Sequence, residues 1–144
     1  MKNCLLVLVL LCVFPAIGQD EIWIKPNRGQ WHENVEYLIN VPSGQMFLEK
    51  GGFTYAFTNF ADALDHRHES GDHEHEAIRS HVVRTSFIGS NPAPDFLEKD
   101  PSGFYENYFL GNDSTKWVSN NPAFQEINYL NLYPNLDLAI YESE

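Results

Sequence analysis

Hydrophobic and polar positions alternate in short runs along most of the chain after residue 34, and these runs are rich in aromatic and β-branched residues. Gly, Pro, Asn or Ser bounds most of them, which is typical of β-strands joined by turns. In the run 53–58, Phe53, Tyr55 and Phe57 share one face, so this face is expected to be core. The predicted strands cover residues 35–41, 45–50, 53–58, 81–88, 105–110, 124–130 and 136–141.

Two glycines, Gly51 and Gly52, separate the second predicted strand from the third. They can supply the positive φ angles of a two-residue turn, so these strands are expected to form an antiparallel hairpin. Taken together, the strands predict an all-β protein, either an antiparallel β-sandwich or an open barrel. The last strand, 136–141, has almost no sequence after it and no further hairpin partner. The domain is therefore expected to be incomplete and to lack its C-terminal strands.

Helical periodicity is weak, because no segment carries an apolar stripe at positions i, i+3, i+4 and i+7 over three turns. The one helix that we expect is short and covers residues 114–118. Asp113 or Ser114 can cap its first turn, and Trp117 can pack inward from its end.

Residues 1–18 have the features of a secretory signal peptide. Lys2 is an early cation, and an apolar run follows it from Leu5 to Phe14. Ala16 and Gly18 provide the small residues of a cleavage site. The apolar run is too short to cross a bilayer, which requires about 20 residues in a helix. We therefore expect a secreted or cell-surface protein without a membrane span.

Both cysteines, Cys4 and Cys12, lie within this leader, so the mature chain from Gln19 is expected to have no disulfide and to depend on its core. Lipidation at Cys12 is disfavoured because Leu11, and not a small residue, precedes it. The net charge is −11 and becomes more negative when the leader is removed, which disfavours nucleic acid and anionic lipid as partners. The length suits a single β domain over residues 19–144, as the N-terminal part of a larger domain.

The segment 65–76 (DHRHESGDHEHE) is a low-complexity stretch without an apolar side chain. If it formed a hairpin about Ser70 and Gly71, its imidazoles could converge on a zinc, copper or nickel ion. Nothing in it can be buried to offset the loss of backbone entropy, so we favour a polar loop over about residues 60–79, with no metal or other cofactor. Histidine titration in this loop, as a pH sensor, is a further alternative. The candidate metal ligands are His66, His68, His73 and His75.

Motifs of common catalytic sites are absent from the sequence, which has no G-x-S-x-G elbow, no glycine-rich phosphate loop and no H-E-x-x-H helix. The acids form no pair that the sequence singles out, and we interpret them as solvated. No catalytic residue is therefore predicted, and a non-enzymatic role is favoured. The acids considered are Glu49, Asp95, Glu98, Glu106 and Asp137.

Aromatic residues form 14% of the chain and allow a second class of function. On the surface of a β domain, some of them could form a platform that stacks against sugar rings. Phe and Tyr at strand spacing are more often part of a core. The candidate platform comprises Trp23, Trp31, Trp117, Tyr105 and Tyr108.

Four short stretches carry a resemblance to known proteins: Asn27-x-Gly29-Gln30-Trp31, Phe87-Ile88-Gly89-x-Asn91-Pro92, Asn107-Tyr108-Phe109-x-Gly111-Asn112-Asp113 and Tyr133-Pro134-x-Leu136-Asp137. With them, the sequence from Ile24 to Tyr141 resembles an N-terminal β domain of unknown function in large secreted proteins of gliding-type Gram-negative bacteria. Those proteins often continue into β-propeller-type repeats, Ig-like modules and a type IX secretion sorting signal. The resemblance implies a fold and a location without catalytic residues, and it implies that the rest of a larger polypeptide is missing here. A variable insertion is expected at 65–76, between the stretches.

These observations lead to two hypotheses of different classes. The first is an exported, non-catalytic structural or interaction module at the cell surface or outside the cell, with an unknown protein or glycan as its partner. The alternative is a carbohydrate-binding or carbohydrate-processing module.

Overall fold

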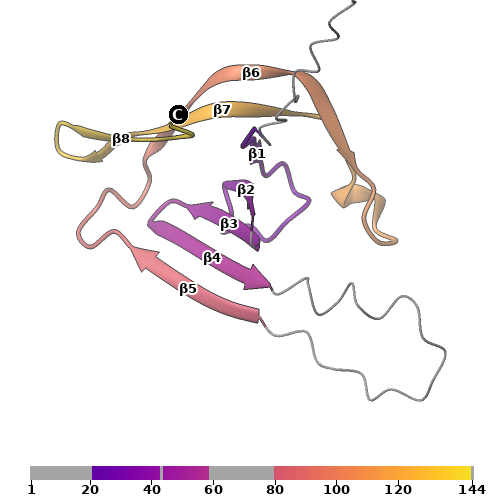
Figure 1. The fold of residues 1–144 in the computed structure, drawn as a ribbon, viewed down its shortest axis with the longest axis horizontal. Coiled ribbons are helices and arrows are strands. Elements are labelled where there is room, and N and C mark those ends of the chain that lie inside the picture. Colours follow the sequence, from indigo (N-terminus) through magenta and orange to yellow (C-terminus); the bar gives the residue numbers. More distant parts are fainter. Residues whose placement is uncertain (1–20, 43, 59–79, 144) are drawn as a thin grey trace, which may run out of the picture.

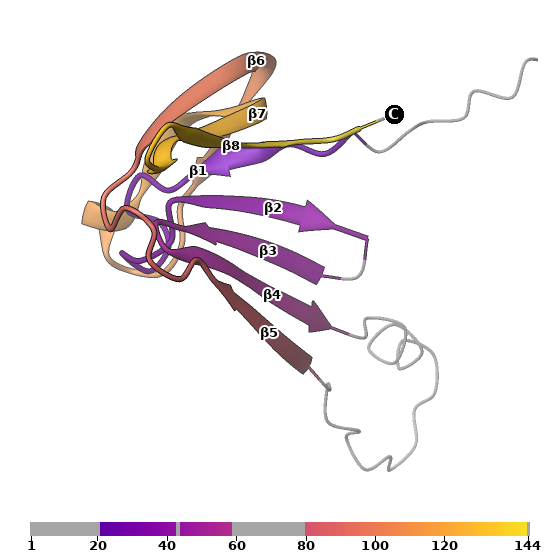
Figure 2. The ribbon, with the colours of Figure 1, turned by 90° about the vertical axis from the view of Figure 1, so that its left-hand side faces the viewer.

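The computed structural model describes residues 21–42, 44–58 and 80–143. Its strands form one eight-stranded antiparallel sheet that curls into a half-barrel (Figures 1 and 2). The strand order is β5-β4-β3-β2-β1-β7-β6, and β8 also pairs with β7. The strands are β1 (Ile24–Pro26), β2 (Tyr37–Val41), β3 (Gly44–Glu49), β4 (Gly52–Thr58), β5 (Ser80–Ser86), β6 (Asp95–Tyr108), β7 (Val118–Tyr133) and β8 (Leu136–Tyr141). The all-β prediction is confirmed, and the curled sheet corresponds to the open-barrel alternative.

The long strand β7 lies between β1 and β6 in the sheet and also pairs with β8. One of its edges pairs with β6 over most of the length of both strands. Its other edge pairs with β1 at Phe124 and with β8 from Glu126 onward, so β1 and β8 lie end to end along this edge. The backbone N–H of Ile22 donates to Glu142 Oε2 at 2.9 Å and connects the segments that flank the two short strands. In the part of the chain that the structure describes, no helix is long and apolar enough to cross a membrane.

The core lies on one face of the curled sheet. Strand pairing aligns Ile24, Ile39, Met46 and Tyr55 across β1 to β4. Tyr129 on β7 is completely buried and closes this core from the opposite side of the curl. The buried cluster consists of Ile24, Tyr37, Ile39, Met46, Leu48, Phe124, Ile127, Tyr129 and Leu132.

The alternation in the sequence located β2, β3, β4, β5 and β8 to within about two residues. It missed β1 and found only parts of β6 and β7, which have 14 and 16 residues. Pro101 and Pro122 interrupt the alternation in these two strands. The sheet tolerates both, because β6 and β7 change register twice and Asp100 and Asn120 adopt positive φ angles of 52° and 55°. A bulged strand therefore continues where the sequence suggested turns.

The hairpin between β3 and β4 is confirmed, but its turn lies one residue earlier than predicted. Glu49 pairs with Gly52, so Lys50 and Gly51 form the turn, and Gly51 does not have a positive φ angle. Gly52 is required for a different reason. A Cβ atom at this position would lie 2.0 Å from the carbonyl oxygen of Thr85 on β5.

The prediction that Phe53, Tyr55 and Phe57 all belong to the core is wrong for Phe57. The three side chains do share a face, and Phe53 and Tyr55 pack against the buried cluster. Phe57 stacks on Tyr55 with a ring separation of 5.9 Å, but it is 38% exposed. Burial decreases toward the end of β4, so a large loss of stability is expected on truncation of Phe53 rather than of Phe57.

The predicted helix is a single 3-10 turn at Ser114–Lys116. Asp113 caps it as expected, because its Oδ1 accepts a hydrogen bond from Thr115 N at 3.0 Å. The inward packing of Trp117 is wrong, since this side chain is 46% exposed. The turn is too short to present an inner face, and Trp117 instead contacts the ring of Phe109 at 5.6 Å.

Candidate functional site

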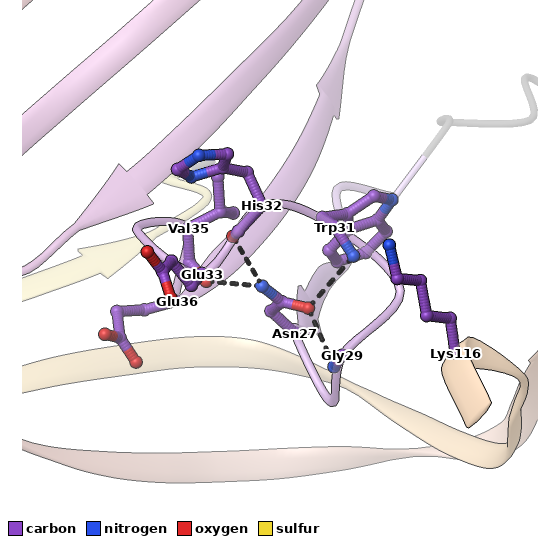
Figure 3. A pocket seen from close by; sticks show the side chains of 8 residues that line it. All are labelled: Asn27, Gly29, Trp31, His32, Glu33, Val35, Glu36 and Lys116. Carbon is purple, nitrogen blue, oxygen red and sulfur yellow. Dashed lines mark hydrogen bonds between the residues drawn. The ribbon is translucent and has the colours of Figure 1, made fainter.

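The loop between β1 and β2 is organised by one side chain, that of Asn27. Its Oδ1 accepts hydrogen bonds from Gly29 N at 3.0 Å and Trp31 N at 3.2 Å. Its Nδ2 donates to His32 O at 2.9 Å and to Val35 O at 2.8 Å (Figure 3). These four bonds replace the pairing that a strand would provide, and the loop holds Trp31 in a fixed position.

We expect Asn27→Ala to lower the free energy of unfolding by about 2 kcal/mol, because it removes four hydrogen bonds, two of them part-buried, and leaves their loop donors and acceptors without this partner. Asn27→Asp keeps the acceptor for Gly29 and Trp31 but places a carboxylate oxygen against two carbonyl oxygens, so it is expected to destabilise as well. Urea unfolding of both variants checks this. Wild-type stability of Asn27→Asp would show that the Nδ2 bonds contribute nothing.

Side chains at alternate positions of β6 contact Trp23, which precedes β1, Lys25 on β1 and Trp31 in the loop that follows. Phe104 meets Trp23 edge to face at 5.1 Å, and Tyr108 meets Trp31 in the same way at 5.3 Å. Between these aromatic pairs, Lys25 Nζ donates to Glu106 Oε1 at 2.7 Å. Phe104, Glu106 and Tyr108 are each two residues apart, as expected for side chains on one face of a β-strand. Their contacts hold the C-terminal end of β6 against residues 23–31.

Glu106 is the charged centre of this arrangement. Burial alone would raise its pKa, but hydrogen bonds from Lys25 and Tyr108 outweigh burial, and the pKa of Glu106 lies below its ordinary value of 4.5. The hydroxyl of Tyr108 donates to Glu106 Oε2. Burial and the neighbouring carboxylate raise the pKa of Tyr108, so its hydroxyl stays protonated at neutral pH.

Because the pKa of Glu106 is lower in the folded state, the pair contributes stability above the unfolded pKa and loses it as pH falls through the folded value. We expect Glu106→Gln to lower the free energy of unfolding at pH 7 by up to about 1 kcal/mol, with the difference from wild type shrinking below about pH 4. Urea unfolding of wild type and the variant at pH 7 and again below about pH 4 measures this difference. Glu33→Gln is the control, since Glu33 forms no ion pair among the described residues. A difference that is independent of pH would contradict the ion pair.

An open groove of about 560 Å³ lies beside the Asn27 loop. Glu33 and Glu36 line one side of it, while Trp31 and Lys116 lie on the other, and Lys116 points toward Trp31 (Figure 3). Glu36 also forms an ion pair with Lys50 at 3.4 Å. The groove therefore combines a half-buried indole with acceptors on one wall and an ammonium donor on the other. The lining residues are Asn27, Gly29, Trp31, His32, Glu33, Val35, Glu36 and Lys116.

The residues suggested as a sugar-stacking platform do not form one flat surface. Trp23 and Trp31 contact Phe104 and Tyr108 at interplanar angles of 80° and 73°. Only Trp31 lines the groove, whereas Tyr105 and Trp117 are exposed elsewhere on β6 and after the 3-10 turn. Sequence reasoning selected these aromatic residues as candidates, but it did not select the residues that line the groove beside Trp31. A pattern of Asn, Gly and Gln around residues 27–30 could have indicated the ordered loop.

The candidate metal ligands His66, His68, His73 and His75 lie outside the described residues, as does the rest of the polar loop at about 60–79. Within residues 21–42, 44–58 and 80–143, no group of three or more His, Cys, Asp or Glu side chains could hold a metal ion.

The acids that the sequence left unassigned form contacts with the backbone and with neighbouring side chains. Glu49 accepts from Arg84 Nη2 at 2.6 Å and from Thr54 Oγ1 at 2.7 Å. Asp137 accepts from the backbone N–H of Asn131 at 2.6 Å, and Glu98 accepts from the hydroxyl of Tyr37 at 3.2 Å. These carboxylates stabilise strand ends and turns.

The stretches that carry the resemblance to known proteins form turns and strand junctions. The backbone N–H of Asn91 donates to Leu132 O at 2.8 Å, and this hydrogen bond ties the β5–β6 connection to β7. Asn107 Oδ1 accepts from Asn120 N at 2.9 Å, where Asn120 has a positive φ angle. Tyr133 OH donates to Ile88 O at 3.2 Å. The physical role of these stretches is to fix the path of the chain.

The fold and its contacts define a curled antiparallel β domain with an ordered Asn-centred loop and a shallow groove beside it. The sequence matches the family described as a domain of unknown function (DUF7948) over residues 24–144. This match covers most of the chain, and the protein belongs to that family. No curated protein and no solved structure matches the chain.

Proposed function

We propose that this chain is an exported, non-catalytic interaction module that acts at the cell surface or outside the cell. One observation carries the proposal. Large apolar side chains that are 46% to 60% exposed occur in the segment between β6 and β7. This β6–β7 aromatic surface consists of Phe109, Leu110 and Trp117, and the rings of Phe109 and Trp117 are 5.6 Å apart.

Aromatic residues are enriched in protein interfaces and are depleted on surfaces that remain in contact with water. On the β6–β7 aromatic surface, Trp117 contacts Phe109 and donates its Nε1 proton to Gly111 O at 3.3 Å. These contacts hold the rings in place before a partner arrives, which reduces the entropy lost on binding. The surface is therefore suited to contact a protein partner or a neighbouring domain.

The larger context of the proposal is a secreted multidomain protein of gliding-type Gram-negative bacteria, in which this chain is the N-terminal domain. The predicted leader at residues 1–18 supports export. Membership of the family supports a role as a recurring module.

Export is tested with the tagged chain in a host that secretes proteins. We expect the mature product to begin at Gln19 and to be degraded by proteinase added to intact cells or recovered from the medium. A product that retains Met1 and resists external proteinase would contradict the proposed location. The replacement of Leu8 by Arg, within the apolar run of the leader, is the matched control and should keep the chain inside the cell.

The groove beside the Asn27 loop supports a second candidate function, carbohydrate binding. An indole with carboxylates and an ammonium group can stack on one face of a sugar ring while hydroxyl groups bind at its rim. A glycan array should then show selective binding that Glu33→Ala or Lys116→Ala abolishes. Asp95→Ala, an exposed acid on β6 away from the groove, is the control. Binding that is unchanged in the groove variants, or no binding at all, would remove this candidate.

A further inference from the structure

Three strands of the described sheet have an edge that no other described strand pairs with: β5, β6 and β8. Natural sheets protect such edges with proline, bulges or charge, because unpaired N–H and C=O groups attract another strand. The β6 edge contains Pro101 and two register shifts. Strand β8 carries the charge of Asp137, and its C-terminal end lies beside a groove lined by Glu21, Asp100, Glu126 and Glu142. These two edges are protected.

The β5 edge has neither a proline nor a bulge, and its one strong charge, Arg84, is paired with Glu49 of the same chain. Its seven residues pair with β4 in continuous register, without a bulge, a glycine or a proline. All seven are exposed, and Val82 and Val83 are 59% and 42% exposed although they point to opposite faces. A regular strand with exposed β-branched residues on both faces has a strong tendency to add a further strand.

One hydrogen bond determines which backbone groups of β5 face outward. Phe87 N donates to Gly51 O at 2.8 Å, just beyond the paired residues Ser86 and Gly52. Because N–H and C=O groups in an antiparallel ladder turn alternately toward each neighbour, Val82 and Arg84 direct theirs away from β4.

With the backbone groups of Val82 and Arg84 facing outward, the sequence of β5 is suited to pair with a second copy of itself. In an antiparallel pair of two β5 strands centred on Val83, Val82 of one copy lies opposite Arg84 of the other, and the two exchange backbone hydrogen bonds. Val83 meets Val83 of the second copy in the closer, non-hydrogen-bonded position, where side chains pack best. No like charges lie directly opposite each other in this register.

Charge favours a second copy at this edge over the others. The chain has a net charge of −11, so two copies repel across most of their surfaces. No acid occurs in β5, and its one strong charge, Arg84, is paired with Glu49 of the same chain at 2.6 Å.

From these observations we propose that β5 is a dimerisation edge, which pairs antiparallel with β5 of a second copy about a two-fold axis at Val83. The two half-barrels then share one continuous sheet. The surface that each copy contributes is small, so the dimer dissociates on dilution.

The register is tested by disulfide trapping in a background without Cys4 and Cys12. Across a non-hydrogen-bonded pair, the Cβ atoms are close enough for a disulfide. We expect Val83→Cys to give a covalent dimer under mild oxidation, several-fold more than Val82→Cys or Arg84→Cys. Equal trapping at the three positions, or none, would overturn the register.

The edge itself is tested by sedimentation equilibrium over a wide range of concentration. We expect wild type to shift from monomer to dimer, and Val82→Pro, which removes an outward N–H but no bond to β4, to remain a monomer. Ala139→Lys on β8 is the control and should dimerise as wild type does. A monomeric wild type, or dimerisation lost only in Ala139→Lys, would refute the proposal. Circular dichroism confirms that each variant retains its strands.

Discussion

Replacement of Tyr129 by alanine is expected to lower the free energy of unfolding by about 4 kcal/mol, the largest effect of any single truncation in this core. Tyr129 is completely buried and contacts the rings of Phe53, Phe87 and Phe96 at centroid distances of 6.4, 6.0 and 4.7 Å. Its hydroxyl donates to Glu49 O at 3.1 Å. Because these partners come from β4, β6 and the β5–β6 connection, the truncation removes contacts from both sides of the curl. Equilibrium unfolding in urea measures the loss.

Tyr129→Phe separates the ring from the hydroxyl. It keeps the aromatic contacts and loses one hydrogen bond, so it is expected to cost about 1 to 2 kcal/mol. A loss below about 1 kcal/mol for Tyr129→Ala would mean that the sheet does not close over this residue, because burial of a complete aromatic side chain is worth more.

Replacement of Gly52 by alanine is expected to cost about 3 kcal/mol, because the added Cβ would meet the Thr85 carbonyl oxygen at 2.0 Å. Backbone atoms cannot rotate away from this contact as a side chain can. Strand β5 must therefore move away from β4 or lose pairing at this end. Thermal unfolding gives the loss, and faster amide exchange along β5 would locate it.

Gly51→Ala is the matched control for Gly52→Ala. A Cβ atom at Gly51 meets nothing within 4 Å, and Gly51 does not have a positive φ angle. The replacement should be neutral or slightly stabilising, because alanine reduces the entropy of the unfolded chain. If both variants were equally mild, the close approach of β4 and β5 would be incorrect.

The strands that the sequence predicted well are those with one core face and regular pairing. Phe53 and Tyr55 alternate with Thr54 and Ala56, and this period of two follows directly from half-burial. The bulged strands could not be found in the same way. At Pro101 and Pro122 the local preference favours a turn, and only the long-range pairing of β6 with β7 overrides it.

The contacts around the candidate site depend on even longer separations. Lys25 and Glu106 are 81 residues apart, and no local pattern indicates that they meet. The aromatic residues Trp31 and Tyr108 could be named as candidates, but their edge-to-face contact follows from the curl of the sheet. The ordered loop at Asn27 was within reach of sequence reasoning, because Asn followed by a glycine two positions later is typical of a side-chain-stabilised turn.

The free edge of β8 is a different surface from the edge of β5. Leu136 and Tyr141 are exposed, and β8 pairs only with β7 among the described strands. The Ala139→Lys control separates that edge from the β5 edge.

Photo-crosslinking from the β6–β7 aromatic surface in intact exporting cells tests the proposed function most directly. A photoreactive phenylalanine analogue at Phe109 should form a discrete crosslink to a polypeptide outside the cytoplasm, and Leu110→Ser in the same chain should reduce it. Ile88, which is 85% exposed on the β5–β6 connection, is the control position for an apolar side chain outside this surface. Crosslinking from Phe109 that does not exceed that from Ile88, or that captures only cytoplasmic proteins, would contradict an exported interaction module.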